Sequence, residues 1–150
     1  MTWSKEPSGK VRKAVGENTI IVGGGLTGCE IAYDLALKGK KPVIVEMLDD
    51  ILKVKNLCAA NSNMLRAIIE RYDIPVYVEA KAKAFENGQF TLEQGGREIT
   101  LPCDNVILSI GYNSAPLVAE GEHIHVIGDA HGVGNLMNAI WTAYDTALSL

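Results

Sequence analysis

Apolar positions in the first third of the chain follow a strand, helix, strand pattern. Residues 19–22 are a β-branched apolar run that ends at a glycine, which is typical of a strand buried on both faces. Residues 26–38 carry apolar side chains at helical spacing and lead into Lys38-Gly39-Lys40, a favourable helix C-terminus. Residues 42–46 are a second strand-like run. This order predicts a βαβ unit with parallel strands and a right-handed crossover.

The rest of the pattern continues in the same way. A helix is predicted at residues 61–72, where Asn61 or Ser62 can cap it and its apolar face consists of Met64, Leu65, Ile68 and Ile69. Further strands are predicted at residues 75–78, 105–110 and 123–127, and a last helix at residues 135–150. The strands and helices alternate, as in α/β proteins with a parallel sheet.

Three short alternating segments interrupt this order between residues 81 and 101. They span residues 81–86, 89–93 and 98–101, and Asn87-Gly88 and Gly95-Gly96 separate them. Such dipeptides form tight hairpin turns because glycine adopts positive φ without steric cost. The predicted fold class is therefore α/β, a Rossmann-like doubly wound parallel sheet with an antiparallel three-stranded β-meander as a crossover.

Composition and charge exclude several classes of protein. The chain has 150 residues, 47% of them hydrophobic, and a formal net charge of −4, values of an ordinary globular domain. It shows no basic footprint for nucleic acid, no apolar run long enough for a membrane and no signal peptide. Cys29, Cys58 and Cys103 lack a CxxC pattern, which indicates free thiols in a reducing cytoplasm. We therefore expect a cytoplasmic protein with no metal, nucleic-acid or membrane partner.

A glycine-rich turn is the main candidate site. The segment Gly23-Gly24-Gly25-Leu26-Thr27-Gly28 fits G-x-G-x-x-G between a predicted strand and a predicted helix. In this motif the first glycine allows the tight turn, the second lets a pyrophosphate approach the backbone, and the third lets helix and strand pack closely. The helix N-terminus then binds the phosphates. A dinucleotide site is the prediction; a tight turn without a ligand is the alternative.

The acidic residue at the end of the second strand bears on the choice of dinucleotide. Glu46 follows Gly25 by 21 residues, close to the spacing of the ribose-binding acid in this motif. A carboxylate accepts hydrogen bonds from the ribose hydroxyls and repels a 2′-phosphate. The sequence therefore favours NADH over NADPH, although Lys53 and Lys55 would weaken the preference if they folded back. The alternative for Glu46 is a solvated strand end.

Four segments in this order resemble a known family. They are residues 20–30 (IIVGGGLTGCE), 43–47 (VIVEM), 105–111 (NVILSIG) and 125–130 (HVIGDA). They resemble the C-terminal part of the 2-enoate reductase and 2,4-dienoyl-CoA reductase group of NADH:flavin oxidoreductases, which are of the old yellow enzyme type. The order of motifs also matches the wider pyridine nucleotide–disulfide oxidoreductase fold. The resemblance covers roughly residues 15–150.

The resemblance implies roles for individual residues. The glycine turn would surround the pyrophosphate of NADH, Glu46 would hold its adenosine ribose, and Glu30 would face the nicotinamide half. Gly111 would pass near the dinucleotide, whereas Gly128 and Asp129 would contact FAD in the complete enzyme; turn and helix capping is the alternative for Asp129. The candidate cofactor-binding residues are Gly23, Gly24, Gly25, Leu26, Thr27, Gly28, Glu30, Glu46, Met47, Gly111, Gly128 and Asp129. No catalytic acid or base and no metal ligand is expected.

Parts of that family's pattern are missing from this sequence. There is one glycine fingerprint rather than two, no flavin-binding barrel, no cysteine cluster for an iron–sulfur centre, and Tyr112–Pro116 replaces the family's usual turn. We therefore expect residues 1–18 to be a polar leader and residues 19–122 an NADH-binding domain. Residues 123–150 would be a returning strand and helix of the FAD-domain type, packed into the same compact unit. The expected partners are the barrel and the N-terminal FAD half-domain of a parent enzyme.

Other interpretations stay open. The chain could be a free-standing dinucleotide-binding module with a regulatory or docking role, or a small protein that binds FAD at its glycine turn. A metal site at His123, His125 and His131 lacks a completing carboxylate or cysteine, so exposed strand-edge histidines are favoured. Trp141 and Tyr144 either pack against the domain or form an interface with the missing parts.

Overall fold

The computed structural model describes residues 15–54 and 57–150. Most of the predicted polar leader, residues 1–18, lies outside these residues. The chain forms two compact units, of which the first ends at Ile110 and the second spans Gly111–Leu150. The predicted packing of residues 123–150 with residues 19–122 in one unit stays a prediction.

A four-stranded parallel sheet organises the first unit. Its strands are β1 (Asn18–Val22), β2 (Lys41–Val45), β3 (Val76–Tyr77) and β7 (Asn105–Leu108), in the order β3-β2-β1-β7. In the register of the sheet, Ile21 lies opposite Ile44 on β2 and Ile107 on β7. The predicted parallel βαβ unit is confirmed, and all carboxyl ends of the strands meet at one edge.

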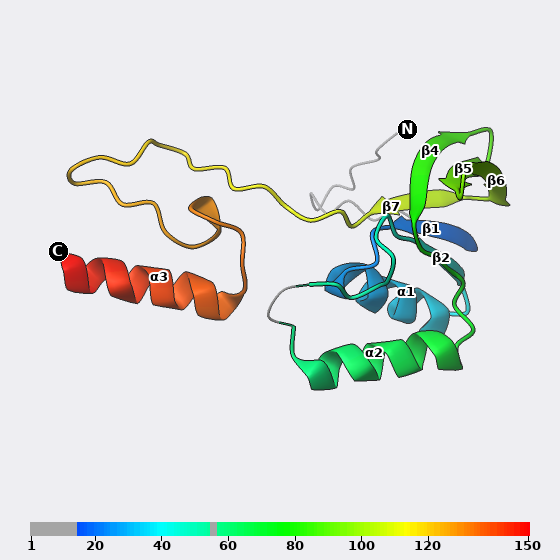
Figure 1. The fold of residues 1–150 in the computed structure, drawn as a ribbon, viewed down its shortest axis with the longest axis horizontal. Helices are drawn as coiled ribbons and strands as arrows, with labels where there is room; N and C mark the ends of the chain where they lie inside the picture. The colour runs from blue at the N-terminus through cyan, green and yellow to red at the C-terminus, as the bar shows by residue number, and fades with distance from the viewer. Residues whose placement is uncertain (1–14, 55–56) are drawn as a thin grey trace, which may run out of the picture. The chain divides into compact units, whose positions relative to one another are not determined.

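Two helices cover one face of this sheet. The helices are α1 (Leu26–Leu37) and α2 (Ala59–Arg71), and Figure 1 shows them on the same side of β1 and β2. Ile21 and Ile44 are fully buried against Leu35, Leu65 and other apolar side chains of these helices. The prediction that Asn61 or Ser62 caps α2 is wrong: the helix begins at Ala59 and its N-cap, Cys58, makes no side-chain capping bond.

An antiparallel sheet covers the opposite face. Its strands β4 (Ala80–Glu86), β5 (Gln89–Gln94) and β6 (Arg97–Pro102) pair in sequence order. Asn87, Gly88, Gly95 and Gly96 all have positive φ, from 50° to 75°, as two-residue hairpin turns require. Phe90 and Leu92 of β5 pack against Ile20 and Val45. The predicted meander is confirmed as the crossover between β3 and β7, and it buries the second face of the parallel sheet (Figure 1).

The second unit is built around one helix. It contains a 3₁₀ turn, η1 (Gly128–Ala130), and α3 (Leu136–Ser149), which Asn135 caps by accepting a hydrogen bond from the Asn138 amide at 3.0 Å. The predicted last helix is confirmed. The predicted strand at residues 123–127 is wrong: Ile124 of this segment forms an isolated antiparallel bridge with Gly121, and the described segment forms no strand. Within this unit no neighbouring strand is present in the described residues to pair with its backbone.

None of the helices in residues 15–54 and 57–150 has the length and apolar character needed to span a bilayer.

Candidate functional site

Gly23 leaves β1 at the carboxyl edge of the sheet, between two neighbouring strands. Its amide donates to the carbonyl oxygen of Val45 on β2 at 2.8 Å. Its φ is +107°, and a methyl group at this position would overlap the carbonyl oxygen of Ser109, the residue that follows β7. Both the backbone conformation and the adjacent chain therefore require glycine.

Gly28 lies in the first turn of α1, directly over the end of β1. A methyl group here would overlap the carbonyl oxygen of Gly23, well inside the 3.0 Å limit for real Cβ contacts. The axis of α1 can therefore come this close to the strand only if residue 28 has no side chain. Gly23 and Gly28 are explained by the packing of the protein itself.

Gly24 is bound through both of its backbone groups to the loop that follows β2. Its amide donates to Glu46 Oε2 at 2.6 Å, and its carbonyl oxygen accepts from the Leu52 amide at 2.7 Å. A methyl group at Gly24 would lie 2.7 Å from Cγ2 of Ile51. The middle of the glycine turn is thus held by the loop that follows β2.

Gly25 differs from the other three glycines of the turn. It is the N-cap of α1, with φ −71° and ψ −173°, a conformation open to any residue. A methyl group there would meet only Cγ2 of Val54, at an ordinary contact distance of 3.8 Å. Neither the backbone nor the packing in the described residues requires glycine at this position. The space beside it fits a group that approaches the backbone from outside the protein.

The N-terminus of α1 adds a second reason for a ligand here. In the described part of the chain no side chain caps α1, and its first turn holds no acidic residue. The first amides of a helix have no partner within the helix, and together with the helix dipole they favour an anion. Leu26 is half-buried and Thr27 is exposed in this turn. The turn and the helix end therefore fit the pyrophosphate of a dinucleotide.

Glu46 lies beside the glycine turn, where the sequence predicts the ribose-binding acid. Its Oε2 accepts from Gly24 and its Oε1 accepts from the Leu48 amide at 2.8 Å. These two backbone bonds fix the carboxylate at the carboxyl edge of the sheet, and the binding of a ribose there stays a prediction. Met47 next to it is 67% exposed, and Glu30 is exposed on α1. The structure therefore gathers the predicted residues of the first unit around one edge, with Glu30 one turn along α1.

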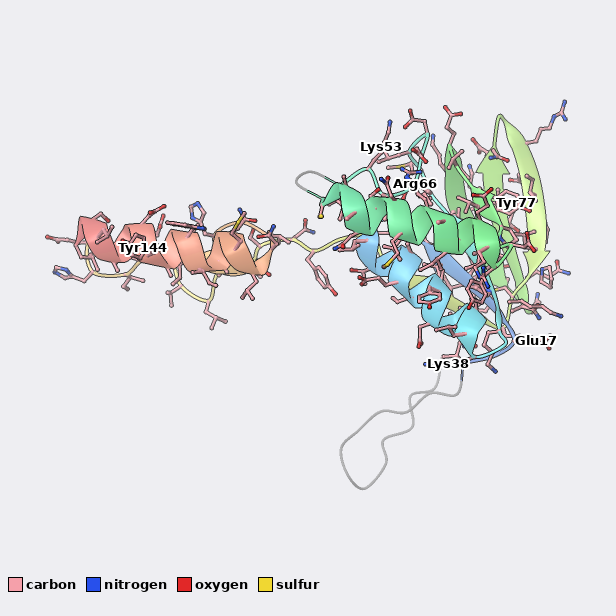
Figure 2. All side chains as sticks on the ribbon, turned by 90° about the horizontal axis from the view of Figure 1, so that it is seen from below. Glu17, Lys38, Lys53, Arg66, Tyr77 and Tyr144 are labelled. Atoms are coloured by element: carbon pink, nitrogen blue, oxygen red, sulfur yellow. The ribbon has the colours of Figure 1, made fainter. Side chains whose placement is uncertain are left out.

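Lys53 and Lys55 are the two lysines that would weaken the NADH preference if they folded back toward the site. The ammonium of Lys53 forms an ion pair with Asp49, and this bond lowers the pKa of the Asp49 carboxyl. Lys55 lies outside the described residues. Figure 2 shows Lys53 and Arg66 at one end of the first unit, and Lys38 and Glu17 at the other. Lys53 is therefore engaged by its own loop.

The remaining predicted residues belong to the second unit. Gly111 is exposed with φ +88°, and Gly128 has φ +59° and donates its amide to Thr142 Oγ1 at 3.1 Å. Asp129 Oδ1 accepts from the Gly134 amide at 3.1 Å, which is the capping role that the sequence left open. On α3, Trp141 and Tyr144 are 56% and 53% exposed and contact each other edge to face.

The histidines and cysteines form no metal site in the residues that the structure describes. His123, His125 and His131 are all exposed. Cys29 and Cys103 are buried, whereas Cys58 is exposed, and all are free thiols. A place near a helix N-terminus lowers the pKa of a thiol, but burial has the larger effect at Cys29 and raises its pKa to about 11.

Thiol labelling tests this assignment. A thiol reagent at about pH 8 is expected to modify Cys58 quickly in the folded chain and to modify Cys29 and Cys103 only after unfolding, because the thiolate is the reactive form. Mass spectrometry of the labelled chain gives the count and the positions. A Cys58→Ser variant is the control and is expected to stay unlabelled; rapid modification of Cys29 in folded protein contradicts the assignment.

Three residues that hold the turn were not found by the sequence analysis. Ser109 packs against Gly23 and Gly28, while Ile51 and Leu52 contact Gly24. They act through backbone groups or through contacts at long sequence distance, and no motif spacing marks them. Leu52 even has φ +58°, a conformation for which sequence analysis would look to glycine or asparagine.

The chain is similar to known oxidoreductases over almost its whole length. It is 41% identical to the cinnamate reductase of Clostridium sporogenes over 145 residues and 29% identical to the NADH oxidase of Thermoanaerobacter brockii over 146 residues. Each alignment covers 93% of this chain and 22% of the relative. The chain thus spans about a fifth of the length of the curated relatives it matches.

A solved structure agrees on the fold. A 2-naphthoyl-CoA reductase in complex with 2-naphthoyl-CoA matches 92% of this chain and 22% of its own, with a TM-score of 0.77 at 20% identity. The family model of pyridine nucleotide-disulphide oxidoreductases matches residues 5–141. The Rossmann-like fold and the glycine turn are those that the sequence predicts. The chain belongs to the pyridine nucleotide-disulphide oxidoreductase family.

Proposed function

We propose that this chain is the NADH-binding domain of a 2-enoate reductase-like flavin oxidoreductase, in which hydride passes from NADH to FAD for the reduction of an activated carbon–carbon double bond. Family membership and the 41% identity to a cinnamate reductase support this proposal. The relatives are several times longer than this chain. The proposal assigns a flavin-binding barrel, an iron–sulfur centre and the N-terminal FAD half-domain to the rest of the parent enzyme.

Gly25 is the observation that carries the proposal. The other glycines of the turn are required by Ser109, Ile51 or the backbone of Gly23, whereas Gly25 is required by nothing in the described residues. A glycine that the protein does not need for its own packing is explained by a ligand that must touch the backbone there. The N-terminus of α1 beside it, which no side chain of the described residues caps, is suited to an anionic ligand.

Each predicted residue then has a role in binding or orientation. The backbone of the segment Gly23–Gly28 surrounds the pyrophosphate, and Glu46 accepts hydrogen bonds from the adenosine ribose. Glu30 and Met47 border the same dinucleotide. The bound dinucleotide and flavin supply the hydride chemistry, and this chain supplies the position. No acid or base of this chain takes part in the proposed reaction.

The second unit completes the proposal on the FAD side. Gly128 and Asp129 form a 3₁₀ turn whose bonds to Thr142 and Gly134 fix its backbone before α3. We assign this turn to FAD in the whole enzyme and Gly111 to the neighbourhood of the dinucleotide.

The preference for NADH rests on the charges near the turn. Glu46 is bound to the turn itself, Asp49 and Asp50 follow it, and the Lys53 ammonium is paired with Asp49. Arg66 likewise pairs with Asp50, so Glu46 is the carboxylate that a ligand at the turn would meet. A 2′-phosphate would be repelled by it, whereas two ribose hydroxyls would find a hydrogen-bond acceptor. NADH is the proposed substrate of this site and NADPH the weaker ligand.

Calorimetric titration of the chain with NADH, NADPH and FAD tests the proposal. NADH is expected to bind most tightly. Absence of detectable NADH binding refutes the assigned function, and NADPH binding more tightly than NADH refutes the role of Glu46. Tightest binding of FAD supports instead the alternative of a small FAD-binding protein.

A Glu46→Gln variant sharpens the test of specificity. The amide offers one acceptor oxygen in place of two, so either the Gly24 or the Leu48 amide loses its partner, and the ribose loses a charged acceptor. NADH binding is expected to weaken about tenfold, with a smaller loss for NADPH. The matched control is Glu98→Gln, an exposed glutamate on β6, which should bind both dinucleotides like the parent chain. Equal losses for both dinucleotides contradict a role of Glu46 in discrimination.

A further inference from the structure

The loop between β2 and α2 holds the glycine turn from one side. Leu52 donates its amide to the carbonyl oxygen of Gly24 at 2.7 Å, and the side chain of Ile51 lies under Gly24. Both side chains are buried, at 6% and 5% exposure. The position of Gly24, and with it of Gly25 next to it, therefore depends on where residues 51 and 52 lie.

Leu52 holds this position in a strained conformation. Its φ of +58° lies in the left-handed region, which is unfavourable for a residue with a side chain. Such a conformation persists only where the surroundings hold it, and strained residues cluster at binding sites. Burial of the Leu52 side chain and its hydrogen bond to Gly24 are two interactions that stabilise this conformation. A third interaction comes from a side chain of α2.

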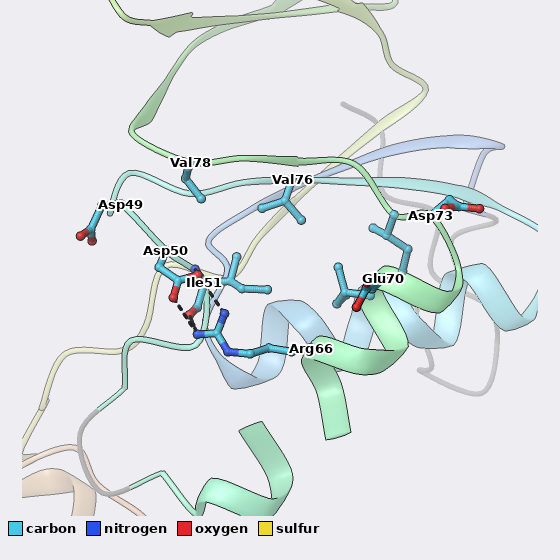
Figure 3. Close-up of a pocket in the computed structure, with 10 residues that line it drawn as sticks. Asp49, Asp50, Ile51, Arg66, Glu70, Asp73, Val76 and Val78 are labelled. Carbon is cyan, nitrogen blue, oxygen red and sulfur yellow. Dashed lines mark hydrogen bonds and ion pairs between the residues drawn. The ribbon is translucent and has the colours of Figure 1, made fainter. Parts of the chain in front are cut away.

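Arg66 reaches from α2 to this loop with a two-pronged contact. Its Nη1 and Nη2 donate to Oδ1 and Oδ2 of Asp50, both at 2.9 Å, and Nη2 also donates to the carbonyl oxygen of Ile51 at 2.7 Å. Figure 3 shows the guanidinium between the helix and these two loop residues. The Asp50 carboxylate in turn accepts from the Ile51 amide at 2.8 Å. Ile51 is thus fixed at both of its backbone groups.

We infer that Arg66 is a positioning residue for the dinucleotide site: through Asp50 and Ile51 it fixes the loop on which the glycine turn rests. The inference rests on the proposed function for its ligand, but the contacts that carry it do not involve the ligand. Leu65 and Ile69 anchor α2 in the core on either side of Arg66, so the guanidinium has a rigid base. Its three bonds transmit that rigidity to residues 50 and 51.

The charges around Arg66 are consistent with this role. Asp49, Asp50, Glu70 and Asp73 line the same surface hollow of about 500 Å³ as Arg66 (Figure 3). The guanidinium lowers the pKa of the Asp50 carboxyl, so the pair stays ionised at neutral pH. The side chains of Arg66 and Asp50 are 39% and 46% exposed, and partly exposed pairs contribute little to folding stability. Loss of the pair is therefore expected to change the position of the loop more than the stability of the fold.

Variants at two arginines of the same helix separate positioning from general stability. Arg66→Met keeps a long side chain but removes the guanidinium group with its hydrogen bonds. Arg66→Lys keeps the positive charge without the two-pronged geometry. Arg71→Met is the matched control at an exposed position of α2. NADH affinity is measured by calorimetry, and exchange of the Gly24, Ile51 and Leu52 amides is measured by NMR. The amides of Ile21 and Ile44 in the sheet serve as the internal reference.

Arg66→Met is expected to bind NADH about tenfold more weakly and to speed exchange at the Leu52 amide, with reference amides and thermal midpoint unchanged. Arg66→Lys should recover part of both losses, because an ammonium forms point contacts rather than a fork. Unchanged NADH affinity in Arg66→Met overturns the inference and leaves the proposed function standing. Faster exchange throughout the sheet also overturns it, since that result shows a general structural role. If the parent chain does not bind NADH, the proposed function fails, and the Leu52 exchange rate alone decides whether Arg66 fixes the loop.

Discussion

Gly25→Ala is expected to weaken NADH binding at least about 100-fold while the chain stays folded. The structure shows why the two effects separate. The backbone at Gly25 has an ordinary conformation, and a methyl group would meet only Val54 at 3.8 Å. The methyl group would instead occupy the space through which, in the proposed function, the pyrophosphate reaches the amides of α1. Each charge-assisted bond lost there contributes about 1.5 to 3 kcal/mol, so two of them suffice for the expected loss.

The measurement pairs calorimetry with thermal unfolding. Alanine is a poorer N-cap than glycine, so the free energy of unfolding is expected to fall by no more than about 1 kcal/mol. Gly121→Ala is the control, because that glycine also has open space around it and lies outside the proposed site. NADH affinity of Gly25→Ala equal to that of the control would remove the observation on which the proposed function rests.

Gly28→Ala is expected to give the opposite result, a loss of folding stability. The added methyl group would overlap the Gly23 carbonyl oxygen, which belongs to rigid backbone and has no alternative rotamer. Overpacking of this kind costs about 1 to 3 kcal/mol, and the better helix propensity of alanine recovers about 1 kcal/mol of it. Because the contact is with rigid backbone, the cost of overpacking is expected at the upper end of this range, which leaves a net loss of about 2 kcal/mol, or a drop of roughly 10 °C in the thermal midpoint.

Thermal and urea unfolding of Gly28→Ala, beside the parent chain and Gly25→Ala, checks this expectation. The two variants carry the same chemical change three residues apart, so the comparison removes the effect of adding a methyl group in general. NADH affinity should also fall in Gly28→Ala, because α1 must move away from β1. A thermal midpoint equal to that of the parent chain would contradict the close approach of Gly28 to Gly23.

Local elements were the most predictable part of the fold. The apolar runs at β1 and β2, the periodicity of α1 and the two glycine turns of the meander each carry their signal within a few residues. The strand expected at residues 123–127 shows the limit of such signals. A strand is stable only when a neighbouring strand pairs with its backbone, and the described second unit provides none. The cap of α2 was likewise misplaced, because packing of Leu65 and Ile69 lets the helix begin at Ala59 without a side-chain cap.

Sequence alone determined which residues form the glycine turn, that a helix follows it, and that Glu46 ends the next strand. These features depend on local conformation and on fixed spacing along one βαβ unit. Tertiary structure alone decided which glycines the protein itself requires. The groups that leave no room for a side chain are Ser109 at Gly23, Ile51 at Gly24 and the Gly23 carbonyl at Gly28. It also decided that Arg66, sixteen residues from Asp50, fixes the loop beneath the turn. Close packing brings together groups whose separation in sequence carries no signal, and among the glycines of the turn it leaves Gly25 as the one that no contact in the described residues requires.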